Sequence, residues 1–297
     1  MQIVYIAGYG RSGSTILDML LASHPHVMGA GELARLFDQW LANHTCSCQK
    51  PIRECEFWQP IFDTFMQSMP NISIEECAQI TLQVESLQNA WRFYLRRFSM
   101  VERTYGHIWR TMLPLIIQQT GGQWIVDSSK STRATNGRSA ALRYLCGYDV
   151  QVVHLVRDPR AVTWSVLRGS NRKLEAGDDA TLRGGALRAV LSWLMTNMAV
   201  QFLPHNWGQQ RVRYEDMITE TQATLQGVYN ALGLDAEGTN ITMPLSCGHG
   251  VAGNRLRRRQ IDVLKLDEEW RTHLPRSARI VVWLSWPLAQ SYRYSFK

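Results

Sequence analysis

The first fifteen residues constrain the fold of this chain more than any other segment. Residues 3–7 (IVYIA) form a short apolar run, residues 8–15 (GYGRSGST) are rich in glycine, and residues 14–22 place apolar side chains on one helical face. A strand that passes through such a loop into a helix presents backbone N–H groups and the positive helix end to an anion. The segment therefore predicts a phosphate-binding loop at the edge of a β-sheet.

The loop departs from the common nucleotide-binding pattern at one position. It matches G-x-x-x-x-G-K-[ST] at every fixed position except the lysine, which is replaced by Ser14. In nucleoside triphosphatases that lysine contacts the β- and γ-phosphates. Its absence favours a single 5′-phosphate that carries one further group. The alternative is a glycine-rich turn that binds nothing.

The rest of the chain alternates strand-like and helix-like segments. Strand-like runs lack polar alternation, which is typical of central parallel strands that are covered on both faces. We expect further strands at 124–126, 152–156 and 211–214, and helices within 73–120 and at 184–203, 219–232 and 276–291. This order predicts an α/β three-layer fold with a mostly parallel sheet flanked by helices. We expect one domain over residues 1–297, a mainly helical insertion at about 38–120 that shapes an acceptor site, and a mobile loop at 169–185.

Composition indicates a folded, modestly basic protein. Of the 297 residues, 32 are Lys or Arg and 25 are Asp or Glu, which gives a net charge of +7, and 45% are hydrophobic. No apolar run approaches the roughly 20 residues of a membrane-spanning helix. Residues 1–8 lack a basic segment and run directly into a strand, so we expect no cleaved signal peptide. Six cysteines are too few for a disulfide scaffold, and we expect a cytoplasmic protein with reduced thiols.

A second motif lies about 145 residues beyond the loop. Residues 153–165 (VHLVRDPRAVTWS) read as a strand followed by R-D-P-R and by a serine eight residues after the first arginine. Together the two motifs resemble those of the sulfotransferases that use 3′-phosphoadenosine 5′-phosphosulfate (PAPS), which have a P-loop-like fold. The resemblance is greatest to carbohydrate, tyrosylprotein and bacterial members. Further similarity lies in residues 213–216 (RYED), 229–234 (YNALGL) and 249–257 (HGVAGNRLR).

The resemblance implies which residues bind PAPS. A dianionic 3′-phosphate is well matched by a planar guanidinium and a hydroxyl, which Arg157 and Ser165 supply. The implied cofactor-binding residues are Gly10, Arg11, Ser12, Gly13, Ser14, Thr15, Arg157, Ser165, Tyr214, Asn254 and Arg257.

The resemblance also implies two catalytic residues for in-line sulfuryl transfer to a hydroxyl. Glu32 takes the position of a catalytic base, and Lys130 that of the lysine that stabilises the leaving phosphate. A histidine base is the alternative to Glu32, with His24 and His26 beside a turn, whereas His154 is expected to be buried and hydrogen-bonded. The reaction requires no metal. The acceptor remains open among a carbohydrate, a small metabolite, a lipid and a peptide tyrosine.

Two other functions compete with this interpretation. A small-molecule or nucleotide kinase would use Asp127 as the carboxylate of a second nucleotide-binding motif, but it explains neither Ser14 nor the second motif. A protein that binds RNA through the arginines at 255–259 is the other alternative. We expect no nucleic-acid partner, and the sequence does not indicate an oligomeric state.

A cluster of cysteines stands apart from these motifs. His44, Cys46, Cys48 and Cys55 are the residue types of a zinc site, but the spacing C-x-C-x₆-C is not a standard pair of C-x-x-C motifs. Free thiols or a local disulfide are therefore favoured, and a bound metal is the alternative.

Overall fold

A five-stranded parallel sheet lies at the centre of the protein. The computed structural model describes residues 1–90, 92–95, 98–169, 179–204, 207–235, 245 and 248–296. The strands lie in the order β2-β3-β1-β4-β5, and every pair is parallel. Their bounds are β1 Gln2–Ala7, β2 Val27–Gly31, β3 Trp124–Asp127, β4 Asp149–Val156 and β5 Gln210–Arg213. The predicted α/β fold class is confirmed.

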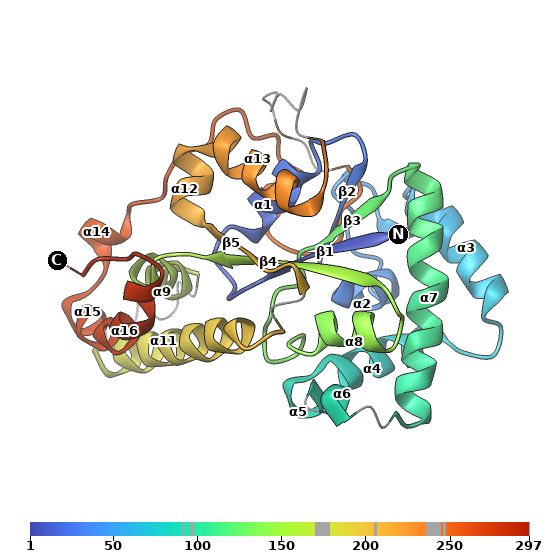
Figure 1. The fold of residues 1–297 in the computed structure, drawn as a ribbon, viewed down its shortest axis with the longest axis horizontal. Helices are drawn as coiled ribbons and strands as arrows, with labels where there is room; N and C mark the ends of the chain where they lie inside the picture. Colours follow the sequence, from blue (N-terminus) through green and yellow to red (C-terminus); the bar gives the residue numbers. More distant parts are fainter. Residues whose placement is uncertain are drawn as a thin grey trace.

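Helices cover both faces of the sheet, which makes three layers (Figure 1). In that view α1, α12 and α13 lie above the sheet, and α2, α8 and α11 lie below it. The α-helices are α1 Ser14–Leu21, α2 Leu36–Leu41, α3 Trp58–Ser68, α4 Ile74–Glu85, α5 Leu87–Ala90, α6 Arg92–Leu95, α7 Met100–Thr120, α8 Arg138–Tyr144, α9 Pro159–Arg168, α11 Asp179–Gln201, α12 Tyr214–Thr219, α13 Thr221–Leu232, α14 Trp270–His273, α15 Arg276–Val282 and α16 Trp286–Ser291. Short 3₁₀ segments are η1 Leu33–Arg35, η2 Ile52–Glu54, η4 Arg255–Arg258 and η5 Trp283–Ser285.

Strand β1 divides the apolar core into two parts. Its side chains alternate between the faces of the sheet, as the period of a strand requires. Ile3 and Tyr5 join the core beneath α2, α3, α7 and α8, whereas Val4 and Ile6 join the core beneath α1, α12 and α13. Because both faces are covered, the strand is apolar from Ile3 to Ala7, and this is the pattern that made it recognisable in the sequence.

Strand β2 was absent from the predicted strands. Its sequence VMGAG holds a single β-branched residue and two glycines, which is a weak strand signal. Both glycines allow close packing. A Cβ atom at Gly29 would lie 2.4 Å from Asp18 Oδ1, and one at Gly31 would lie 2.2 Å from the carbonyl oxygen of Val251. The lack of room for a side chain at positions 29 and 31 therefore requires glycine, despite its low strand propensity.

The helical predictions are largely confirmed, with two differences. Tyr214 begins α12 instead of ending β5, and residues 276–291 form α15, η5 and α16 instead of one helix. Of the loop predicted to be mobile at 169–185, residues 170–178 lie outside the described residues, and the prediction is wrong for residues 179–185, which belong to α11. Within the described part of the chain, no helix is both long and apolar enough to cross a membrane.

Candidate active site

The glycine-rich loop connects β1 to α1, as predicted. Its backbone is held in a conformation that few side chains tolerate, since Arg11 has a φ of 66° and Gly13 a φ of 92°. Gly13 also lies against the ring of Tyr214, where a Cβ atom would be 2.5 Å from a ring carbon. Tyr214 therefore packs against the loop. The amide groups that precede α1 are those that bind phosphate in loops of this type.

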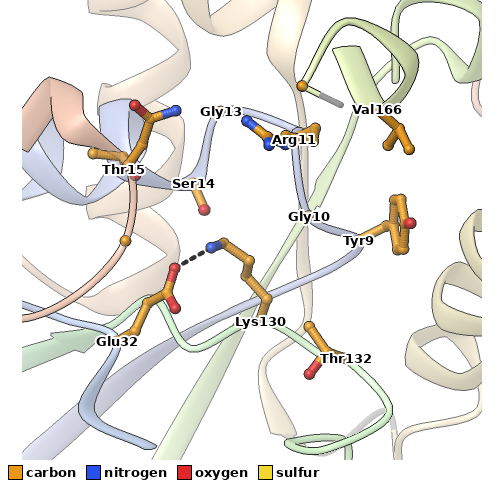
Figure 2. A pocket seen from close by; sticks show the side chains of 13 residues that line it. Tyr9, Gly10, Arg11, Gly13, Ser14, Thr15, Glu32, Lys130, Thr132 and Val166 are labelled. Atoms are coloured by element: carbon orange, nitrogen blue, oxygen red, sulfur yellow. Dashed lines mark hydrogen bonds and ion pairs between the residues drawn. The ribbon is translucent and has the colours of Figure 1, made fainter. Parts of the chain in front are cut away.

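A cavity of about 1020 Å³ opens beside this loop. It is large enough for a nucleotide, since ligand sites in proteins usually measure about 300–1,000 Å³. Figure 2 shows its lining, which comes from the loop, from the ends of β2 and β3, from α9 and from the segment before η4. The lining residues are Tyr9, Gly10, Arg11, Gly13, Ser14, Thr15, Glu32, Lys130, Thr132, Val166, Gly169, Gly253 and Asn254.

Glu32 and Lys130, the two predicted catalytic residues, form an ion pair inside this cavity. Lys130 Nζ donates a hydrogen bond to Glu32 Oε1, and Figure 2 shows the Ser14 side chain directed toward the same point. Glu32 directly follows β2, whereas Lys130 lies three residues after the end of β3. Both positions are at the carboxyl edge of the parallel sheet, where α/β proteins bind their ligands.

The backbone of Lys130 is strained and firmly held. Its φ is 68°, which is in the left-handed region and unusual for lysine. Its carbonyl oxygen accepts hydrogen bonds from the Tyr5 hydroxyl and from Thr135 Oγ1. Strained backbone of this kind concentrates at functional sites, because the surrounding structure has to enforce it. These two hydrogen bonds therefore fix the direction in which the lysine leaves the sheet.

Arg157 lies beside the loop but does not face the cavity. Its Nη1 donates to the carbonyl oxygen of Arg11 at 3.0 Å, and its guanidinium lies 4.1 Å from the centre of the Tyr214 ring. Its Nη2 pairs with Asp267 Oδ2 at 3.0 Å. Ser165, on α9, is also buried and also absent from the cavity lining. The motif predicted to hold a 3′-phosphate is thus adjacent to the loop and occupied by an internal carboxylate.

Two buried polar atoms near the loop lack partners. Ser12 Oγ and Arg157 Nε have no hydrogen-bond partner among the described residues. Buried polar groups are nearly always hydrogen-bonded, so an unpaired pair of donors beside a predicted anion site fits a ligand that accepts hydrogen bonds.

The segment before and within η4 divides its predicted residues between two roles. Asn254 lines the cavity, and its side chain accepts a hydrogen bond from the backbone N–H of Leu256. Arg257 is buried, and its Nη2 donates to Asp18 Oδ2 and to Ser128 Oγ, each at 2.7 Å. It lines a neighbouring cavity of about 310 Å³, which also includes Glu32. Direct contact between Arg257 and a phosphate stays a prediction.

Histidines and the Asp127 carboxylate do not line the large cavity. His154 is fully buried and hydrogen-bonded to Asn197 Oδ1 at 2.9 Å, as expected, and burial lowers its pKa to about 4. His24 shares a hydrogen bond with the carbonyl oxygen of Asp235. Asp127 is buried, and its carboxylate is already paired with the guanidinium of Arg138. Among the described histidines, none takes the place of Glu32 in the lining.

Sequence reasoning missed several residues of the site. Thr132 lies two residues after Lys130, so its proximity in the sequence to a predicted catalytic residue could have indicated it. Tyr9 lies inside the first motif, at a position where the pattern allows any residue, and Val166 directly follows the last residue of the second motif. Asp267 belongs to no motif, and nothing in the sequence relates it to Arg157, from which it is separated by 110 residues.

Comparisons with known proteins identify the family. A model of the sulfotransferase family matches residues 3–238. The chain belongs to the sulfotransferase family. No curated protein sequence matches it.

Two sulfotransferase domains are among the solved structures that match this chain. The domain from the curacin biosynthetic pathway is 18% identical with a TM-score of 0.47, and the match covers 100% of this chain and 99% of that chain. The domain from the Synechococcus PCC 7002 olefin synthase is 20% identical with a TM-score of 0.48 and coverage of 100% and 96%. A sulfotransferase from Mycobacterium avium is 12% identical with a TM-score of 0.46 and coverage of 80% and 65%.

Proposed function

We propose that this sulfotransferase transfers the sulfuryl group of PAPS to an acceptor hydroxyl, giving a sulfate ester and adenosine 3′,5′-bisphosphate. The observation that carries the proposal is the ion pair between Glu32 and Lys130, which lines the same cavity as the phosphate loop. A base and a cation are both needed for this reaction, and here they lie side by side.

The loop is proposed to hold the 5′-phosphosulfate arm. The residues that supply backbone amides or hydroxyls are Gly10, Arg11, Ser12, Gly13, Ser14 and Thr15. The unpaired Ser12 hydroxyl supports this placement. Ser14 provides a hydroxyl where triphosphatases have a lysine, which suits one phosphate better than three.

The second motif is proposed to hold the 3′-phosphate. Arg157 is joined to the loop through the Arg11 carbonyl, and its unpaired Nε leaves one donor for a phosphate oxygen. Ser165 and Tyr214 complete this side of the site, with Asn254 and Arg257 on the other. A phosphate that reaches Arg157 has to share or displace Asp267, which pairs with the same guanidinium.

The proposed reaction is an in-line displacement at sulfur. The acceptor oxygen forms a bond to sulfur while the bond from sulfur to the bridging oxygen of the 5′-phosphate breaks. Glu32 accepts the hydroxyl proton, and Lys130 stabilises the negative charge that develops on the bridging oxygen. Their ion pair brings a carboxylate oxygen and an ammonium nitrogen together beside the phosphate loop, where these roles place them.

The competing functions are less well supported. A kinase needs a free carboxylate for magnesium, but the Asp127 carboxylate is fully buried against Arg138. An RNA-binding surface needs several exposed arginines; Arg258 and Arg259 are exposed, but Arg257 is buried and pairs with Asp18, so it is not available to such a surface.

The decisive experiment combines binding and turnover. We expect adenosine 3′,5′-bisphosphate to bind the purified chain in calorimetry, and labelled PAPS to sulfate members of a panel of sugars, lipids, small alcohols and tyrosine peptides in magnesium-free buffer. ATP with magnesium serves as the comparison. Binding and turnover that occur only with ATP and magnesium would contradict the proposal and favour a kinase.

A further inference from the structure

Four side chains that bind metals in other proteins converge outside the large cavity. They are Cys46, Cys48 and Cys55, which flank η2, and His249, which lies about 200 residues further along the chain. Their ligand atoms all lie within 4.8 Å of one another. The segment that carries His249 leads into η4, so the cluster joins two parts of the chain that are far apart in sequence.

The distances match those of a tetrahedral site. Cys48 Sγ lies 3.6 Å from Cys55 Sγ, which lies 3.7 Å from Cys46 Sγ. His249 Nδ1 lies 3.3 Å from Cys55 Sγ and 4.0 Å from Cys46 Sγ. A tetrahedral zinc with ordinary bond lengths places two sulfurs about 3.8 Å apart and a sulfur and a nitrogen about 3.6 Å apart.

The thiols are arranged as ligands and not as a disulfide. All three cysteines are free, and each sulfur–sulfur distance above is far longer than the roughly 2.05 Å of a disulfide bond. The Cys55 sulfur also accepts hydrogen bonds from the backbone N–H groups of Phe57 and Trp58.

We propose that Cys46, Cys48, Cys55 and His249 bind one Zn²⁺ as a closed, structural site. Three thiolates and one imidazole are a soft donor set that suits zinc better than magnesium or calcium. Four protein ligands leave no position for substrate, so the ion has no catalytic role. On binding, three S–H protons leave to solvent, three Zn–S bonds and one Zn–N bond form, and no group is oxidised or reduced.

The surroundings of His249 hold its ring in place. The ring stacks on Phe57, with centroids 4.9 Å apart and planes 9° from parallel. The backbone carbonyl oxygen of His249 accepts a hydrogen bond from Trp58 Nε1 at 2.7 Å. Both aromatic residues lie within three residues of Cys55, so the same short segment supplies a ligand and positions another. These contacts restrict the orientation of the His249 ring and the position of its backbone.

The proposed zinc ion would fix one wall of the active site. Ser47, between two of the ligands, binds the carbonyl oxygen of Gly250 through both its backbone N–H and its hydroxyl. Val251 then pairs with Gly31, and the N–H of Glu32 donates to the Val251 carbonyl at 2.9 Å. His249, one of the four proposed ligands, therefore lies two residues before Val251, whose carbonyl oxygen holds the backbone N–H of Glu32. This role is independent of which sulfuryl donor the enzyme uses.

The sequence pointed to the wrong histidine. His44 is exposed and is not part of the cluster, although it lies two residues before Cys46. His249 was recognised only as part of the motif at residues 249–257. A metal was the less favoured alternative because the spacing C-x-C-x₆-C is not a standard pair of C-x-x-C motifs, and nothing in the sequence places His249 beside these cysteines.

Zinc content measured on the purified chain tests the proposal. Purified without chelators, the wild-type chain should contain about one zinc per chain by inductively coupled plasma mass spectrometry. Cys55→Ser should lose most of it. Two matched controls should keep it: Cys77→Ser removes a buried cysteine outside the cluster, and His44→Ala removes the nearby exposed histidine.

Cobalt provides a second readout that does not depend on a variant that folds. Wild-type chain produced with Co²⁺ should show thiolate-to-cobalt charge transfer and the intense ligand-field bands of tetrahedral coordination. Folded wild-type chain that contains no zinc and shows no such bands with Co²⁺ would overturn the proposal, as would zinc that persists in Cys55→Ser. Neither measurement uses a sulfuryl donor, so failure here leaves the proposed function untouched.

Discussion

Two clusters of opposite charges lie on either side of the turn at residues 127–130, and they differ mainly in burial. On one side Lys130 pairs with Glu32, and their side chains are 17% and 19% exposed in the cavity. On the other side Arg138 pairs with Asp127 and Glu85, and all three are within 1% of full burial. Similar charges are thus open to substrate in one cluster and sealed in the other.

The sealed cluster positions the open one. Arg138 begins α8, Asp127 ends β3 and Glu85 ends α4, so one guanidinium joins three elements. The Cζ atom of Arg138 also lies 4.1 Å from the ring centre of Trp109. A buried ion pair is weak evidence for net stability, because desolvation offsets much of its attraction. Its effect here is to fix the turn from which Lys130 departs.

The largest expected effect is on turnover, when the open cluster loses its cation. Lys130→Ala should lower kcat by about 10²–10⁴-fold, because the leaving oxygen loses its stabilising charge. Affinity for adenosine 3′,5′-bisphosphate should change little, since the loop amides remain. Single-turnover transfer from labelled PAPS and calorimetry measure the two quantities.

A matched control removes a cation of similar exposure away from the cavity. Arg143 pairs with Asp149 at 3.3 Å on the far end of β4, and Arg143→Ala should leave kcat within about twofold of wild type. An unchanged kcat in Lys130→Ala would rule out the proposed role of the lysine.

The open cluster was predictable from the sequence and the sealed one was not. The family resemblance indicated both residues, and Lys130 follows a strand that the sequence predicts, although β2, which Glu32 follows, was not among the predicted strands. Their meeting follows from parallel topology, which brings the ends of β2 and β3 together. Glu85, by contrast, lies in a helix of ordinary composition, 53 residues from Arg138, and only tertiary packing brings them together.

Other failures of prediction have the same cause. The missed strand β2 is explained by Asp18 and Val251, which require glycines at positions 29 and 31. His249 joins cysteines about 200 residues away, and Asp267 reaches Arg157 across 110 residues. Local patterns identify elements and motifs, but they carry no information on which distant side chain fills the remaining space.

An intermediate effect is expected on nucleotide affinity when the carboxylate of Asp267, which pairs with Arg157, is removed. Asp267→Asn should strengthen binding of adenosine 3′,5′-bisphosphate about tenfold, because a dianionic phosphate no longer competes with a carboxylate 3.0 Å from Nη2. Calorimetry at two salt concentrations measures the change. Asp262→Asn is the matched control, since Asp262 is exposed and should have little effect. Weaker binding in Asp267→Asn would mean that the carboxylate orients Arg157 for the nucleotide and does not compete with it.

The smallest expected effect is a pH dependence of stability that originates in the sealed cluster. Burial raises the pKa of Glu85 to about 7, although the positive charge of Arg138 opposes the rise. A carboxyl group with a raised pKa binds its proton more tightly in the folded state than in the unfolded state. Its contribution to stability is therefore complete below the unfolded pKa, near 4.5, and is lost as the pH rises through 7.

The variant Glu85→Gln isolates this contribution. Glutamine keeps an oxygen that can accept from the Tyr105 hydroxyl and from Arg138, but it does not titrate. Between about pH 6 and pH 8 the wild type should lose roughly 1 kcal/mol more unfolding free energy than the variant, measured by urea denaturation. Glu75→Gln, at an exposed position of the same helix, should retain the wild-type pH dependence. Parallel pH profiles for wild type and Glu85→Gln would show that Glu85 is ionised throughout this range. The two carboxylates and one guanidinium of the sealed cluster would then carry one net negative charge close to the positive charge of Lys130.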